Sequence, residues 1–170
     1  MDFHLSLSNT LINRKSCRKF QPGVTIPETT LNLIRWAANR APYASGGPRR
    51  EYFFVTDVVQ KNELYLACME QKYVNDCSVA IVFCGTEPGK RLRQGFSKFV
   101  FDCTAACMCA DLMAVSMGYS TVWIGNFLPE RVKEILKTDL RPTIILLVGK
   151  KKPEPLLQPE DKDEKTSTVD

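Results

Sequence analysis

Histidine is nearly absent from this sequence, and its scarcity excludes several kinds of enzyme. The 170 residues contain one histidine, His4, close to the N-terminus. A zinc site with several histidine ligands, or a relay between two histidines, cannot be built from one imidazole within a single subunit. Any reaction at this chain must therefore be one that needs no pair of histidines.

The cysteines lack the spacing of a disulfide framework or of a metal site. Seven are present, an odd number, which fits reduced thiols in the cytoplasm better than a secreted scaffold. Cys103, Cys107 and Cys109 form a C-x3-C-x-C run that matches neither a zinc ribbon nor a ferredoxin. We expect buried thiols and no metal. No apolar stretch follows a basic start at the N-terminus, so we expect no signal peptide and a cytoplasmic protein.

Charge is unevenly distributed along the chain. The last 18 residues hold six acids and two lysines, a net charge of −4, so residues 1–152 carry +8 against a total of +4. We expect one folded domain over residues 1–152 and an acidic tail over 153–170 without an independent fold. The basic domain predicts an anionic partner, such as a phosphate, a nucleotide, a nucleic acid or a membrane surface.

Hydrophobic periodicity predicts alternating helices and strands, and hence an α+β domain. Helices are expected over 6–14, from residue 28 to the position before Ala41, and over 61–73, 98–117 and 130–137. Strands are expected over 52–55, 79–83, 119–124 and 143–148. Trp36 is expected in the core, whereas Trp123 fits either the core or a stacking position.

The expected helix over 98–117 is apolar on nearly all sides. Asp102 and Asp111 interrupt it, which argues against a membrane span. These acids are expected to cap, to pair with a basic loop or to face a dimer seam rather than to act as general acids. A helix with this much apolar surface indicates packing across the two-fold axis of a homodimer, or a sandwiched position within one subunit.

The strongest local cluster of charge lies at residues 14–20, which read Arg-Lys-Ser-Cys-Arg-Lys-Phe. Arginine offers a planar fork of donors, lysine a mobile charge and serine a neutral donor, a combination that suits a phosphate dianion. A solvated basic turn is the alternative reading. Cys17 has basic neighbours and would be prone to oxidation if exposed.

Four segments, taken in order, resemble the FMN-dependent nitroreductase family. Residues 14–20 resemble its arginine-rich opening motif, and 34–42, Ile-Arg-Trp-Ala-Ala-Asn-Arg-Ala-Pro, its helix before an Ala-Pro-Ser loop. Residues 102–127 resemble its central helix and flavin-edge strand, and 144–149 its last core strand. The resemblance covers nearly all of residues 6–152.

The resemblance implies a three-layer fold with a central mixed, mainly antiparallel sheet between helices, a long buried helix at a dimer interface, and FMN between the two subunits. Arg14, Ser16 and Arg18 would bind the cofactor, with Lys15 acting mainly through its backbone. The other residues that it assigns to FMN are Pro42, Tyr43, Ala44 and Ser45 from the partner subunit, Trp123, Ile124, Gly125 and Asn126 along the ring, with a backbone N–H near Gly125 at N5, and Lys150 or Lys152 at the phosphate.

The activity implied by the resemblance is hydride transfer from NAD(P)H through FMN N5 to a nitroaromatic, a quinone or a similar acceptor, with ping-pong kinetics. Flavin carries this chemistry, which suits a chain with one histidine. Ser45, Gly46 and Gly47 resemble instead the loop of the branch that oxidises azoline rings. A flavin store or sensor with little turnover, and a nucleic-acid-binding module that uses the arginines at 14–19, 49–50 and 91–93, also stay open.

Overall fold

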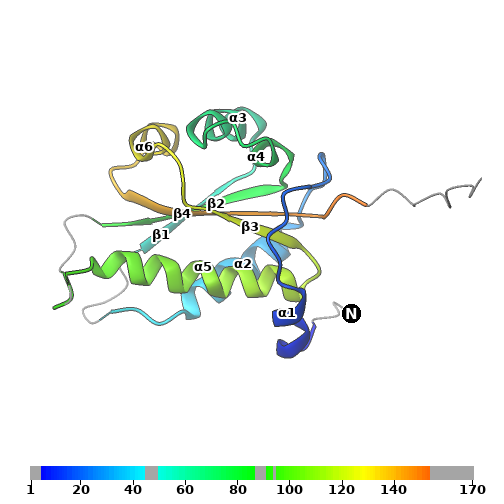
Figure 1. Ribbon diagram of the computed structural model, residues 1–170, viewed down its shortest axis with the longest axis horizontal. Helices are drawn as coiled ribbons and strands as arrows, with labels where there is room; N and C mark the ends of the chain where they lie inside the picture. The colour runs from blue at the N-terminus through cyan, green and yellow to red at the C-terminus, as the bar shows by residue number, and fades with distance from the viewer. Residues whose placement is uncertain (1–4, 45–49, 87–90, 94, 154–170) are drawn as a thin grey trace, which may run out of the picture.

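Four strands form one sheet at the centre of the protein, and helices cover both of its faces (Figure 1). The computed structural model describes residues 5–44, 50–86, 91–93 and 95–153. His4, Ser45 to Gly47 and the tail from residue 154 lie outside these described residues. The elements are, in chain order, α1 (Leu7–Asn13), α2 (Glu28–Arg40), β1 (Arg50–Val55), α3 (Val58–Ala67), α4 (Tyr73–Asp76), β2 (Val79–Gly85), α5 (Lys98–Ser116), β3 (Ser120–Ile124), α6 (Pro129–Leu136) and β4 (Arg141–Gly149).

The strand order is β1-β2-β4-β3, and each neighbouring pair is antiparallel. A parallel bridge between Ser16 and Thr121 adds the chain before α2 to the β3 edge. Helices α3, α4 and α6 cover one face of the sheet, and α2 and α5 cover the other (Figure 1). The predicted three-layer α+β fold with a mixed, mainly antiparallel sheet is therefore confirmed.

Strand β2 separates two hydrophobic cores. All seven of its residues are buried, as its continuous apolar run predicts. Because successive side chains point to opposite faces, Ala80 and Val82 pack with α3 and α6. Ile81 and Phe83 pack with α2 and α5 on the other face.

Helix α5 lies against the sheet and beside α2 (Figure 1). Small residues on its buried side allow this close packing, among them Cys103, Ala106, Cys107 and Ala110. By length and composition alone α5 could cross a membrane, but half of that stretch is buried inside the protein. Helix α5 therefore forms, with α2, the hydrophobic core on this face of the sheet.

Two expectations were wrong. The helix expected over 61–73 is two helices, because Met69 and Glu70 adopt left-handed backbone conformations with φ of 56° and 55°. It also begins earlier than expected, since the Asp57 side chain accepts a hydrogen bond from the Gln60 N–H at 2.9 Å and caps α3. Trp36 is 51% exposed rather than in the core.

Candidate functional site

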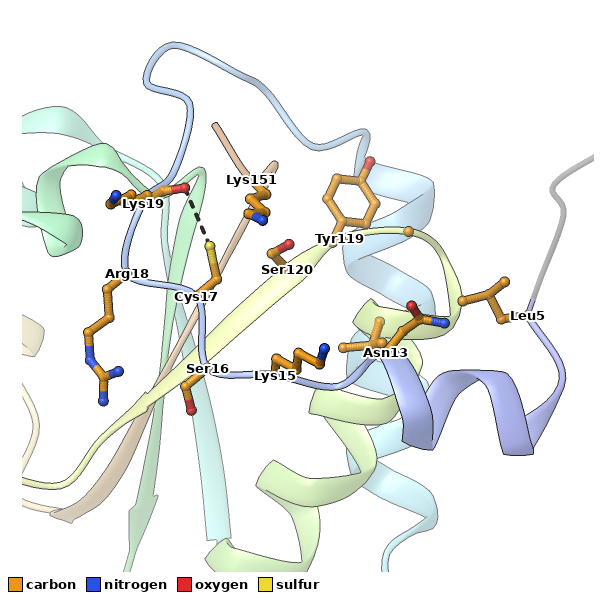
Figure 2. A pocket seen from close by; sticks show the side chains of 12 residues that line it. Leu5, Asn13, Lys15, Ser16, Cys17, Arg18, Lys19, Tyr119, Ser120 and Lys151 are labelled. Atoms are coloured by element: carbon orange, nitrogen blue, oxygen red, sulfur yellow. Dashed lines mark hydrogen bonds between the residues drawn. The ribbon is translucent and has the colours of Figure 1, made fainter. Parts of the chain in front are cut away.

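Residues 14–18 run along the β3 edge as an extended segment. The Cys17 N–H donates to the Thr121 carbonyl at 2.8 Å, and Ser16 is the bridge partner of Thr121. Side chains in an extended segment alternate between faces, so Arg14, Ser16 and Arg18 share one side. Figure 2 shows Ser16 and Arg18 directed to one side of the segment and Cys17 to the other.

The end of this segment is clamped to the chain after β4. Phe20 is 1% exposed, and a Cβ at Gly149 would lie 3.0 Å from its ring, so a larger residue there would push the ring aside. The Gln21 N–H donates to the Lys150 carbonyl at 2.8 Å, and the Lys152 N–H donates to the Lys19 carbonyl at 2.9 Å. These contacts bring the basic run of residues 14–19 beside the lysines of residues 150–152, which are about 130 residues away in the chain.

A cavity of about 750 Å³ opens beside the segment (Figure 2). Four cationic residues, Lys15, Arg18, Lys19 and Lys151, and two serines, Ser16 and Ser120, are in its wall. Its volume lies within the range of about 300–1,000 Å³ that is common for small-molecule sites. Positive charge and neutral donors of this kind fit a phosphate group. The other lining residues are Leu5, Asn13, Cys17, Val115, Gly118 and Tyr119.

The three lysines after β4 have different positions. Lys151 lines the cavity, although sequence reasoning selected Lys150 or Lys152. The Lys150 ammonium donates to the Gly118 carbonyl at 2.8 Å and lies 4.1 Å from the centre of the Tyr119 ring. Lys152 is exposed and joins the segment through its backbone. Because residues 150–152 are all lysine, the sequence does not indicate which of the three side chains points into the cavity.

The predicted ring-binding stretch begins at the end of β3. Trp123 is half-buried, and Gly125 and Asn126 are exposed just after the strand. The Ile124 side chain is 2% exposed and packs in the core on the α3 and α6 side. Ile124 can therefore contribute to a bound ring only through its backbone.

Asp111 links α5 to this stretch. Its carboxylate is 1% exposed and accepts hydrogen bonds from the Thr121 hydroxyl at 2.6 Å and the Trp123 indole N–H at 2.8 Å. Burial raises the pKa of the Asp111 carboxyl, while these two hydrogen bonds and the charge of Arg14 oppose the rise. Of the roles expected for this acid, none included orienting Trp123.

The loop after α2 is held at the opposite end of α5. The Ala44 N–H donates to Oδ1 of Asp102 at 2.7 Å, so this buried acid does bind a loop, through the loop's main chain. Pro42 and Tyr43 are exposed beside it. Ser45, the last loop residue assigned to the cofactor, lies outside the described residues.

Arg50 fixes this loop, and sequence reasoning missed it. Its guanidinium donates to the Tyr52 hydroxyl oxygen at 2.6 Å and to the carbonyls of Ala41 at 2.7 Å, Pro42 at 2.9 Å, Ala38 at 3.2 Å and Asp102 at 3.2 Å. The last carbonyls of a helix have no hydrogen-bond donor within the helix, and at the end of α2 Arg50 is the donor. Its position at the start of a strand, after a Gly-Pro loop, is the signal that the sequence offers.

The two parts of the predicted site lie far apart along α5. Asp102 holds the loop and Asp111 holds β3, nine residues further on. Nine residues of α-helix rise about 13 Å. Pro42, Tyr43 and Ala44 therefore do not approach Trp123 along this helix within one subunit.

The thiols of α5 pack in the core. Cys103 and Cys107 lie four residues apart, on one face of α5, and both are fully buried. Cys109 lies off that face and is half-buried. Burial raises the pKa of Cys103 to about 11. Within the described part of the chain, no three histidine, cysteine or acidic side chains converge as metal ligands would.

Fold and site together define an α+β protein with a cation-lined cavity at one edge of its sheet and a long core helix behind it. The sequence model of the nitroreductase family matches residues 11–76 and 67–150. The chain belongs to this family, and it is an oxidoreductase of a group that generally uses flavin.

Solved structures of the family have the same fold. A nitroreductase family protein from Clostridium novyi NT is similar with a TM-score of 0.82 and 24% identity, over 89% of this chain and 88% of that one. Nitroreductase A from Vibrio parahaemolyticus is similar with a TM-score of 0.79 and 20% identity, over 98% of this chain and 79% of that one. NfrA1 from Bacillus megaterium is similar with a TM-score of 0.78 and 23% identity, over 97% of this chain and 74% of that one. No curated protein sequence matches the chain.

Proposed function

We propose that this protein is an FMN-dependent NAD(P)H oxidoreductase that reduces a nitroaromatic, a quinone or a similar acceptor. The observation that carries the proposal is the cation-lined cavity beside the extended segment of residues 14–18, which runs along the edge of β3. It offers charge for a phosphate and, at the end of the same strand, exposed backbone for a flat ring.

The donors present fit FMN. Arg14, Ser16 and Arg18 would hold its phosphate and ribityl side, and the cavity adds Lys15 and Lys151 from its wall. Trp123 and the exposed backbone at Gly125 and Asn126 would support the ring. Bound FMN would supply hydride transfer at N5, first from NAD(P)H and then to the acceptor, with ping-pong kinetics.

A homodimer would complete the site. Helices α1, α2 and α5 leave apolar side chains exposed on the face away from the sheet, a pattern typical of interfaces. These residues are Leu7, Leu11, Ile12, Leu33, Trp36, Val100, Phe101 and Met108. A two-fold axis through this layer could bring the Pro42 to Ala44 loop of one copy to Trp123 of the other, which the spacing along α5 prevents within one copy.

All seven cysteines are free, which suits a reducing compartment, and we place the protein in the cytoplasm. Two measurements test the proposed reaction. We expect the purified protein to be yellow, or to become so when FMN is added and the excess removed, and we expect the colour to bleach with NADH or NADPH under anaerobic conditions. A protein that stays colourless would contradict the flavin assignment, and a yellow one that does not bleach would be a store or sensor.

The Arg18→Ala variant tests the phosphate contact. Loss of a charged hydrogen bond should weaken FMN binding by about 1.5–3 kcal/mol. Arg131→Ala is the matched control, because Arg131 is exposed on α6 and pairs only with Glu134 at 2.8 Å among the contacts described. Fluorescence titration of FMN gives both dissociation constants, and equal values would refute the role of Arg18.

A further inference from the structure

The carboxylate of Asp111 is buried in an apolar helix, where packing alone does not require it. Its side chain is 1% exposed, and its neighbours on the same face of α5 include Cys107 and Ala114. Burying a carboxylate costs several kcal/mol unless hydrogen bonds compensate for it. A leucine would avoid that cost, so the contacts of the two oxygens decide what Asp111 does.

Both oxygens accept hydrogen bonds from residues of β3, the strand along which the segment of residues 14–18 runs. Oδ1 accepts from the Thr121 hydroxyl at 2.6 Å, and Oδ2 accepts from the Trp123 indole N–H at 2.8 Å. The indole is thereby fixed about its side-chain torsions, since N–H···O bonds weaken steeply away from a straight line.

The same carboxylate also feels the charge of the cationic segment. The Thr121 carbonyl accepts from the Cys17 N–H at 2.8 Å, so the strand that Asp111 binds also carries the segment. The charge of Arg14 favours the ionised form of Asp111, in which both oxygens accept hydrogen bonds. Cys107, one turn earlier on α5, is a further titratable group beside it and is fully buried.

We propose that Asp111 is a positioning residue of the flavin site, which orients the Trp123 indole from behind β3. This inference rests on the proposed function. Asp111 is buried and acts on a bound ring through Trp123.

Two substitutions separate positioning from packing. In Asp111→Asn, the amide oxygen can still accept from the Trp123 N–H, and the amide N–H can donate to the Thr121 hydroxyl, which is both donor and acceptor. Asp111→Leu keeps the volume approximately and removes both hydrogen bonds. Thr121→Val is the matched control, because it removes the second bond of Asp111 and leaves the bond to Trp123.

The experiment uses a Trp36→Phe background, in which Trp123 is the single tryptophan. Hydrogen exchange of the indole N–H, followed by NMR without FMN, reports the bond to Asp111. We expect a protected indole in the parent, in Asp111→Asn and in Thr121→Val, and at least tenfold faster exchange in Asp111→Leu. FMN affinity should fall by about tenfold in Asp111→Leu, equivalent to the loss of one hydrogen bond, and stay within about twofold in Asp111→Asn.

A further variant keeps the test decisive if Asp111→Leu does not fold. Trp123→Phe removes the donor from the other side and should weaken FMN binding similarly, and where both are soluble the double variant should be no weaker than either single one. The proposal would be overturned if Asp111→Leu left either the indole exchange rate or the FMN affinity unchanged. If Asp111→Leu does not fold, an unchanged FMN affinity in Trp123→Phe would overturn it. A parent with a protected indole and no affinity for FMN would instead overturn the proposed function, and with it the flavin part of this inference.

Discussion

Helix α5 holds the two parts of the candidate site with one buried aspartate each, Asp102 at the loop after α2 and Asp111 at β3. The two aspartates differ in the number of hydrogen bonds that they accept. Asp102 and Asp111 are each 1% exposed. Asp111 uses both oxygens, one for Thr121 and one for Trp123. Asp102 uses Oδ1 for the Ala44 N–H, and its Oδ2 has no hydrogen-bond partner among the residues that the structure describes.

The difference follows from what each acid binds. The Asp111 end rests on a regular strand, whose side chains alternate and so present two donors to one helix face. The Asp102 end rests on the chain that leaves α2, where main-chain groups need partners and Arg50 supplies most of them. One part of the site is thus fixed by side chains on a strand, and the other by charged groups that bind the backbone of a loop.

The largest expected effect comes from removing Arg50. Arg50→Met should lower the free energy of unfolding by about 3 kcal/mol, because the partly buried carbonyls of Ala38, Ala41 and Asp102 lose a charged donor at once. Urea unfolding measures it. The matched control is Arg35→Met, whose guanidinium lies 4.3 Å from the Phe54 ring and 4.0 Å from Glu28, with 42% of its side chain exposed, and should cost less than about 1 kcal/mol. Equal costs for the two would show that Arg50 does not hold the loop end.

Replacing each acid by leucine compares the two ends directly. Asp111→Leu deprives two buried or half-buried donors of their acceptor, and Asp102→Leu deprives one main-chain donor. We expect losses of about 2 and about 1 kcal/mol respectively, since each unsatisfied donor is costly and removal of a buried charge partly compensates. Thermal or urea unfolding gives the order, and a larger loss at Asp102 would reverse the comparison.

Stability should depend on pH through Asp111. Its pKa is raised above 3.8 in the folded protein, mainly by burial, so the folded state binds this proton more tightly than the unfolded chain. Its contribution to stability is therefore greatest at low pH and falls as the pH rises from about 3.8 through the folded pKa. Asp111→Asn does not titrate, so its stability relative to the parent should increase over this window and then level off. A difference that is constant with pH, or that decreases, would contradict the raised pKa.

Much of the fold could be predicted because it is encoded locally. The continuous apolar run of β2 predicts a buried strand and the apolar length of α5 predicts a long core helix, and both elements are found where expected. Met69 and Glu70 were not predicted to break a helix, since nothing in these residue types requires a left-handed backbone. Trp36 was misplaced because an apolar residue on a helix gives the same pattern whether it faces the core or an outer surface.

The candidate site was predicted by type of residue and not by contact. The segment of residues 14–18 could be recognised from its cations and hydroxyl, and the structure places it on the β3 edge. The bond from Asp111 to Trp123 and the many bonds of Arg50 join residues from different elements, so no spacing in the sequence reports them. Such contacts become visible only when the helix and the sheet are packed together.

The smallest expected effect is a difference in thiol reactivity between the cavity wall and the half-buried side of α5. Cys17 lies in the cavity wall and is only partly buried. Cys109 lies within α5, two residues before Asp111, and its pKa is raised mainly by burial. At neutral pH a thiolate-directed reagent should modify Cys17 first and Cys109 more slowly. Cys68, Cys77 and Cys84 should react last, because burial raises their pKa values to about 12. FMN should slow labelling of Cys17 by a few-fold and change Cys109 less, since Cys109 is not in the cavity wall. Mass spectrometry of partly labelled protein resolves each site, and protection of Cys109 in preference to Cys17 would place the ligand outside this cavity.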